Sequence, residues 1–89
     1  MKEFGGTPLH FAANKNHPQI IEYLIKQGAS VDPLNYLNRT PLYEASFNGG
    51  TSSVKVLLDS GADFKIAAKD GSTPWHAANC NHYASFLKN

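Results

Sequence analysis

A tetrapeptide that begins with Thr-Pro occurs three times in this chain of 89 residues. Thr-Pro-Leu-His at residues 7–10 is followed by Thr-Pro-Leu-Tyr at 40–43 and Thr-Pro-Trp-His at 73–76, at a constant interval of 33 residues. A Gly-Ala pair, at 28–29 and 61–62, keeps the same interval. A fixed period of this length is typical of stacked structural repeats, so it constrains the fold more than any other feature of the sequence.

Each repeat begins with residues that start a helix. The Thr hydroxyl can accept a hydrogen bond from a first-turn amide, and Pro suits the first helical position because no N–H is needed there. These signals predict helices that begin at Pro8, Pro41 and Pro74. Small residues such as Ala12 and Ala45 follow on one face of the predicted helices. They let a neighbouring backbone come close while burying little side chain themselves.

A second helix is predicted in the first two repeats. Pro18 can start it in the first repeat, where the apolar residues Ile20, Ile21, Leu24 and Ile25 recur at the spacing of one helix face. Apolar residues between 54 and 58 repeat this stripe in the second unit. The glycines at positions 28 and 61 then stand where a left-handed residue closes the C-terminus of a helix.

The segments 29–39 and 62–72 show no helical period and are rich in Asp, Asn, Pro and Gly, which predicts an extended loop with a tight turn. Neither helix pair can bury its apolar stripe alone, so successive units have to stack and share a core along one axis. The sequence therefore predicts an elongated, all-α repeat solenoid.

The chain resembles the ankyrin-repeat family from about residue 5 to residue 89, with the signature T-P-L-H-x-A-A at residues 7–13. The resemblance implies helix-turn-helix plus hairpin-loop units stacked along one axis. It divides the chain into a non-repeat leader (1–4), repeat 1 (5–37), repeat 2 (38–70) and a partial repeat 3 (71–89).

Departures from the family pattern are concentrated in the second repeat. Asn38 replaces the usual turn glycine, which is tolerable because Asn adopts positive φ more readily than most residues. Tyr43 replaces the motif His, and residues 50–53 replace the His-led start of the second helix, which predicts a weak first turn. Neither end carries a polar capping repeat, so we expect marginal stability or self-association through Phe86 and Leu87.

Composition excludes several classes of partner and setting. The net charge of +1 gives no strong field to attract nucleic acid or an anionic membrane. The apolar runs are far shorter than the roughly 20 residues that cross a bilayer. The single cysteine, Cys80, cannot form an intramolecular disulfide, and no basic-then-apolar leader opens the chain. We therefore expect an intracellular protein, cytoplasmic or nuclear.

No catalytic or metal-binding constellation emerges from the residue types. His76 and Cys80 are four residues apart on one predicted helix, but zinc needs three or four converging ligands. No nucleophile, base and oxyanion donor can be assembled, so we expect neither an enzyme nor a cofactor or metal. The resemblance implies instead that the motif histidines, such as His10, make hydrogen bonds within and between repeats.

The resemblance also implies where a partner would bind. In ankyrin-like stacks the hairpin tips and the exposed side of the first helix line a concave groove. Aromatic residues and Arg at such places often dominate binding energies. The alternatives are that Tyr36, Leu37 and Phe47 pack against neighbouring loops, or that isolated exposed apolar residues have no functional meaning. Glu44 either belongs to this surface or is an inward carboxylate, solvated or hydrogen-bonded. The residues at these places are Asn14, Lys15, Tyr36, Leu37, Arg39, Phe47, Asn48, Lys69, Asp70, Ser72, Cys80 and Asn81.

Two functions follow as hypotheses. The first is a protein–protein interaction module that binds a protein or peptide in its groove and acts as a scaffold, adaptor or regulator. The second is a structural spacer within a longer array whose binding site or catalytic domain lies elsewhere.

Overall fold

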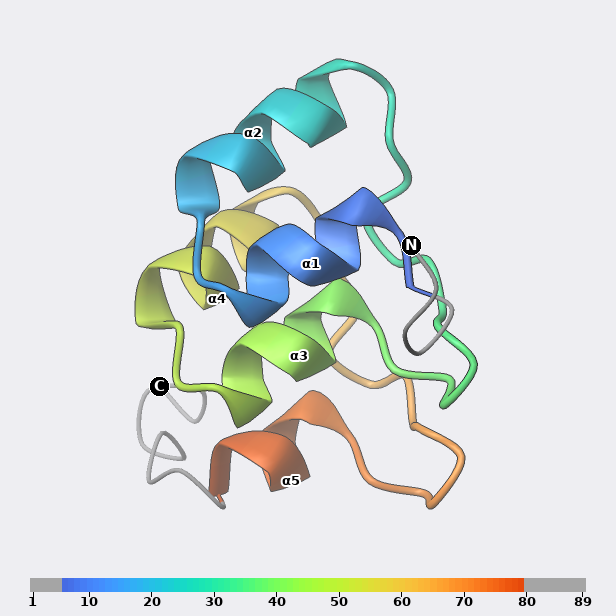
Figure 1. Cartoon of the computed structure of the whole chain (residues 1–89). Coiled ribbons are helices and arrows are strands. Elements are labelled where there is room, and N and C mark those ends of the chain that lie inside the picture. The colour runs from blue at the N-terminus through green and yellow to red at the C-terminus, as the bar shows by residue number, and fades with distance from the viewer. Residues whose placement is uncertain (1–5, 80–89) are drawn as a thin grey trace.

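A computed structural model describes residues 6–79 of the chain. Its described part is helical and contains no strand, in agreement with the all-α prediction (Figure 1). The first helices of the three units are α1 (Pro8–Asn14), α3 (Pro41–Phe47) and α5 (Pro74–Asn79). The second helices are α2 (Pro18–Lys26) and α4 (Thr51–Asp59).

The first helices begin where the Thr-Pro steps predict. Thr7 Oγ1 accepts a hydrogen bond from the backbone N–H of His10 at 3.3 Å, and Thr40 Oγ1 accepts one from that of Tyr43 at 3.1 Å. Each bond satisfies a first-turn amide that has no partner within the helix.

The second helices end at the glycines, as predicted. Gly28 and Gly61 have φ values of 98° and 93°, a conformation that residues with a Cβ adopt at a steric cost. The next amide then bonds back into the last turn, from Ala29 N to Leu24 O and from Ala62 N to Leu57 O, both at 3.0 Å. These bonds satisfy helix carbonyls that would otherwise lack a donor.

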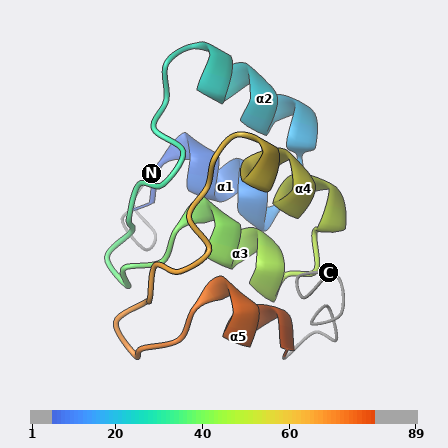
Figure 2. The same cartoon turned by 180° about the vertical axis from the view of Figure 1, so that it is seen from behind.

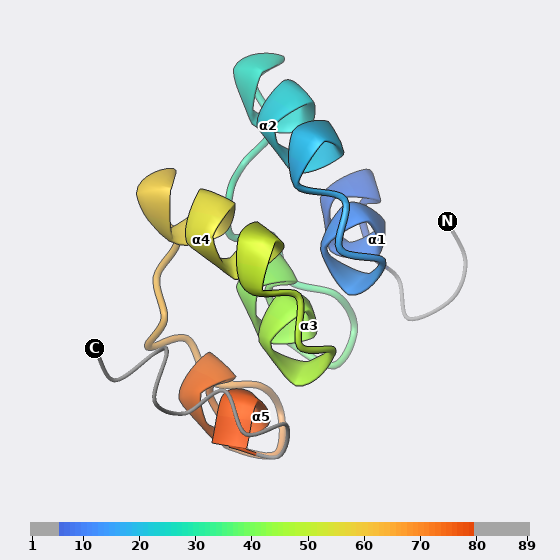
Figure 3. The same ribbon diagram turned by 90° about the vertical axis from the view of Figure 1, so that its left-hand side faces the viewer.

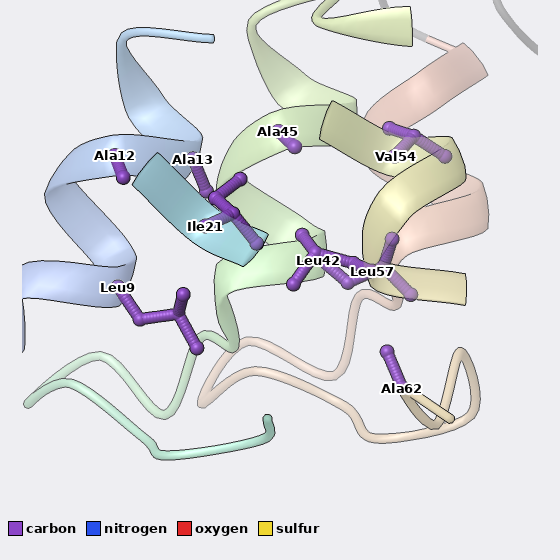
Figure 4. Packing of buried hydrophobic residues seen from close by; sticks show 9 residues of the cluster. All are labelled: Leu9, Ala12, Ala13, Ile21, Leu42, Ala45, Val54, Leu57 and Ala62. Atoms are coloured by element: carbon purple, nitrogen blue, oxygen red, sulfur yellow. The ribbon is translucent and has the colours of Figure 1, made fainter. Parts of the chain in front are cut away.

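The helices form two rows (Figure 3). One row contains α1, α3 and α5, in which α3 packs against both neighbours, and the other contains α2 packed against α4. The predicted stacking of units along one axis is therefore present. The main cluster of buried hydrophobic side chains lies where the rows meet (Figure 4), and its members are Leu9, Ala12, Ala13, Ile21, Leu42, Ala45, Val54, Leu57 and Ala62.

Both connecting loops leave the stack on the same side (Figure 2). Within the first loop, Asn38 N donates to Asn35 O at 2.9 Å and Asn38 has a φ of 60°, so Asn does take the left-handed place of the usual glycine. Gly71 occupies the matching place in the second loop with a φ of 87°. Lys69 N donates to Leu37 O at 2.9 Å, so the two turns are bonded to each other.

One prediction about the core was wrong. Ile20, placed in the apolar stripe of the second helix, is 47% exposed, whereas Ile21 is fully buried. The second row contains only α2 and α4 in the described part of the chain, so α2 has a neighbour in that row on one side only. Leu24 and Ile25 are half-buried against the core.

The expected weak first turn of α4 is supported from the neighbouring unit. Asn16, in the turn between α1 and α2, accepts hydrogen bonds through Oδ1 from the backbone N–H and the hydroxyl of Ser53, at 3.3 and 2.7 Å. The side chain of Asn16, 37 positions before Ser53, therefore caps the N-terminus of α4. The proposed leader, Cys80, Asn81, Phe86 and Leu87 lie outside the described residues.

Candidate partner-binding surface

The first hairpin turn is held in shape by Asn35. This buried side chain accepts hydrogen bonds through Oδ1 from the backbone N–H groups of Leu37 at 3.0 Å and Arg39 at 2.9 Å. Its Nδ2 donates to the Glu44 carboxylate at 3.3 Å. Asn35 therefore ties the turn that carries Tyr36, Leu37 and Arg39 to helix α3.

Glu44 is an inward carboxylate, which is one of the two alternatives that the sequence analysis left open. It is 8% exposed, and Asn14 Nδ2 donates to Oε1 at 3.1 Å while Asn35 donates to Oε2. Both carboxylate oxygens thus accept hydrogen bonds, which offsets much of the cost of removing the charge from water. The bond to Asn14 joins α1 to α3 across a repeat boundary.

Arg39 lies beside this carboxylate. Its guanidinium carbon is 4.7 Å from the centre of the Tyr43 ring and 5.7 Å from that of the Phe47 ring, both within the range of cation–π attraction. Its Nη1 is 3.8 Å from Glu44 Oε2. The side chain is 27% exposed, so the group is partly desolvated and held over two rings of α3.

The motif histidine fixes the backbone of Arg39. His10 Nε2 donates to Arg39 O at 2.7 Å, while His10 Nδ1 accepts from Thr7 N at 3.1 Å. This confirms the expected bonds within and between repeats. Burial lowers the pKa of the imidazole, although the Arg39 carbonyl and the Glu44 charge act in the opposite direction. His76 makes the same contact with Thr73 N at 3.1 Å.

The second hairpin turn is joined to α3 through hydroxyl groups. The hydroxyl of Tyr43 lies 2.7 Å from Ser72 Oγ, and Ser72 Oγ donates to Asp70 Oδ1 at 2.6 Å. Hydrogen bonds from the Ser72 hydroxyl and amide lower the pKa of the Asp70 carboxyl, and the charge of Arg39 lowers it further. Tyr43, which replaces the motif His, thus also contacts the following turn.

The structure brings many of the predicted contact residues together, in different roles. Tyr36 and Phe47 are 56% and 43% exposed, whereas Leu37 is half-buried and its backbone carbonyl accepts the bond from Lys69 N. Asn48 is exposed but donates to Glu44 O at 2.8 Å within its own helix end. Of the remaining predicted residues, Lys15, Lys69 and Asp70 are exposed, Asn14 and Ser72 are committed to the bonds above, and Cys80 and Asn81 lie outside the described part.

Phe11 is a residue of this surface that the sequence reasoning missed. It is 50% exposed on α1, and Lys15 Nζ lies 6.0 Å from the centre of its ring. It stands 33 positions before Glu44, so the repeat period was the signal that could have identified it. We call the following set the contact strip: Phe11, Asn14, Lys15, Tyr36, Leu37, Arg39, Phe47, Asn48, Lys69, Asp70 and Ser72.

Between residues 6 and 79, His, Cys, Asp and Glu side chains form no group of three or more that could hold a metal ion. None of the helices described there has the length and apolar character required to span a bilayer.

Comparison with known proteins identifies the family. The family model described as ankyrin repeats (3 copies) matches residues 1–68. The chain is 33% identical over 76 residues to the E3 ubiquitin-protein ligase KEG of Arabidopsis thaliana, which covers 85% of this chain and 5% of that protein. It is 33% identical over 75 residues to protein phosphatase 1 regulatory subunit 12A of Mus musculus, covering 84% of this chain and 7% of the relative.

A third relative, the palmitoyltransferase Hip14 of Drosophila melanogaster, is 40% identical over 71 residues, which are 79% of this chain and 11% of that protein. The chain thus matches only a small part of each relative. The match of the family model over residues 1–68 shows that the chain belongs to the ankyrin-repeat family, whose repeats are in general protein–protein interaction modules and typically not catalytic.

Proposed function

We propose that this chain is a protein–protein interaction module that binds a protein or peptide through the contact strip and acts as a scaffold, adaptor or regulator. The observation that carries the proposal is the exposure of large side chains on a fixed frame. Tyr36 and Phe47 are 56% and 43% exposed beside the stacked guanidinium of Arg39. Aromatic residues and Arg are the types that most often dominate binding energies at protein interfaces.

The frame beneath these side chains supports binding by a preformed shape. His10 bonds to Arg39, Asn35 bonds to Arg39 and Glu44, and Glu44 accepts from Asn14. The turn and two first helices are therefore connected by side chains before any partner arrives. A surface that is already ordered loses less conformational entropy on binding, so more of the contact energy appears as affinity.

The proposal concerns a protein or peptide partner rather than nucleic acid or a membrane. The net charge of +1 gives no field of one sign over the molecule. An intracellular setting, cytoplasmic or nuclear, and the division into repeats 5–37, 38–70 and 71–89 remain parts of the same proposal.

The test replaces the two exposed aromatic residues. The partner is identified by affinity capture from cells that express the gene, and its Kd is then measured by calorimetry. Y36A and F47A should each weaken binding by about 1 to 4 kcal/mol and leave the Tm nearly unchanged. Y23A is the matched control, because Tyr23 is 61% exposed on α2 and lies outside the contact strip. Unchanged affinity together with a lost fold would reverse the assignment.

A structural spacer is the second candidate, and one observation favours it. Ile20 and Tyr23 leave apolar surface exposed on α2, as a repeat would if it packed against a further unit. A spacer predicts that the isolated chain captures nothing specific, whereas a longer protein that contains it does.

A further inference from the structure

The guanidinium of Arg39 is oriented by its surroundings without being hydrogen-bonded by them. Within the described part of the chain, no acceptor takes a hydrogen bond from its five N–H groups. The approach to Glu44 Oε2, at 3.8 Å, is an ion pair and exceeds hydrogen-bond length. A partly desolvated guanidinium thus retains its donors for an outside acceptor.

Glu44 lies beside these donors but takes its hydrogen bonds from other residues. Asn14 and Asn35 already hold its two carboxylate oxygens at 3.1 and 3.3 Å. The rings of Tyr43 and Phe47 attract the cation through their π faces, which fixes its position and uses none of the carboxylate-binding geometry of the guanidinium. Arg39 is therefore held in place by groups that leave its planar fork unused.

We propose that Arg39 is the receptor for a side-chain carboxylate of the partner, an Asp or Glu in a peptide segment whose neighbouring apolar residue contacts Phe47 or Tyr36. This inference rests on the proposed function and names the chemistry of the partner. A carboxylate accepts two parallel hydrogen bonds from a guanidinium, and such charge-assisted pairs are about twice as strong as neutral ones. The adjacent exposed rings supply apolar area.

The charges of the contact strip fit a single negative charge. Lys15, Arg39 and Lys69 are its cations and Asp70 is its carboxylate, and together with the adjacent buried Glu44 their net charge is positive by one. Glu44 lies 3.8 Å from the guanidinium, and Asp70 is close enough to interact with it electrostatically. A doubly charged phosphate would meet stronger repulsion from these two groups than a carboxylate does.

In the experiment, peptides that bind the 89-residue chain are selected from a random library. Each peptide is displayed as a fusion through its C-terminus. The best Glu- or Asp-containing peptide is then made with the acidic residue unchanged, amidated to Gln or Asn, or replaced by phosphoserine. We expect amidation to weaken binding to the wild-type chain by about 10- to 100-fold. With R39Q the acidic and amidated peptides should bind equally well, and R39K should recover only part of the difference because it restores the charge without the fork.

Two controls isolate the role of the guanidinium. K26Q removes one positive charge from an exposed residue of α2 and should leave the difference between the acidic and amidated peptides unchanged. Circular dichroism of R39Q should retain the helical signal, because the bonds from His10 and Asn35 reach the backbone of Arg39 and not its side chain.

The outcomes distinguish this inference from the proposed function. Selected peptides without enrichment of Asp or Glu, tighter binding of the phosphoserine peptide, or an acidic preference that survives in R39Q would each overturn the assignment of Arg39 and leave the interaction module intact. If no selected peptide binds the contact strip, this inference fails, whereas the proposed function is decided separately by the effect of Y36A and F47A on the partner captured from cells.

Discussion

His10 shows how one side chain can serve both its own repeat and the next. Its Nδ1 accepts from Thr7 N at 3.1 Å, and its Nε2 donates to Arg39 O at 2.7 Å. The arrangement requires a neutral imidazole with its proton on Nε2. A second proton on Nδ1 would face the N–H of Thr7 and abolish that bond.

The stability of the fold should therefore depend on pH through His10. Burial lowers the pKa of this imidazole in the folded state, so between that pKa and about 6.5 the unfolded chain binds more protons than the folded one. The contribution of the neutral His10 ring to the free energy of unfolding is fully present above about pH 6.5. It is lost as the pH falls toward the folded-state pKa of this ring. We expect a lower urea midpoint at pH 5 than at pH 7.5, and a smaller difference in H10Q.

The matched variant H17Q, at an exposed position, should keep the wild-type pH dependence. If H10Q does not fold, an NMR titration of the His10 ring in the wild-type chain gives the pKa directly. A value at or above about 6.5 would contradict the prediction.

At the scale of elements, α4 begins without a capping side chain of its own. Its N-cap residue is Gly50, and the side chain that reaches its first turn belongs to Asn16, which is held at a φ of 58°. A Cβ placed on Gly50 would lie 2.8 Å from Asn16 Oδ1, closer than such atoms approach. The absence of a side chain at Gly50 thus leaves room for the cap from the neighbouring unit.

G50A should therefore destabilise the chain by about 1 to 3 kcal/mol, the usual cost of inserting a group into an occupied space. In an N16G background the same substitution should cost much less, because the side chain that it meets is gone and Gly tolerates the positive φ at position 16. The free energies of unfolding of the four proteins, from urea titrations, give this coupling. S52A, at an exposed position of the same turn, is the control. Equal costs in both backgrounds would contradict the proposed contact.

These examples indicate which parts of the structure could be predicted from the sequence. The starts of α1 and α3 and the ends of α2 and α4 depend on residues next to one another in the chain, so local rules located them at Pro8, Pro41, Gly28 and Gly61. The cap from Asn16 could not be found in this way, because it depends on contacts between residues 37 positions apart.

The contact strip shows the same difference between features that the sequence predicts and features that depend on distant contacts. Its residues other than Phe11 followed from the family resemblance. The inward position of Glu44 beside it did not, because that position depends on Asn14 and Asn35 from two other segments. The stacking of Arg39 over Tyr43 and Phe47 likewise required the position of α3 relative to the turn. The exposure of Ile20 follows from the number of neighbours around α2, which its own periodicity does not contain.

At the scale of the whole molecule, α3 connects the units. It packs against α1, α4 and α5, and its Leu42 is fully buried in the shared core. In a stack of repeats each unit contacts only its neighbours, and stability arises largely from the interfaces between them. Loss of packing in the middle unit should therefore remove support from the units on both sides of it.

L42A tests this dependence. Truncation of a buried Leu costs about 2 to 5 kcal/mol, comparable to the entire stability of a domain this small. We expect hydrogen exchange to accelerate together in α1, α3 and α5, because α1 and α5 each lose the neighbour against which they pack. L34A, at a loop residue that is 49% exposed, should leave exchange in all three helices nearly unchanged. Retained protection in α1 with loss confined to α3 would mean that the first helix pair folds without its neighbour, against the physical basis of the stack.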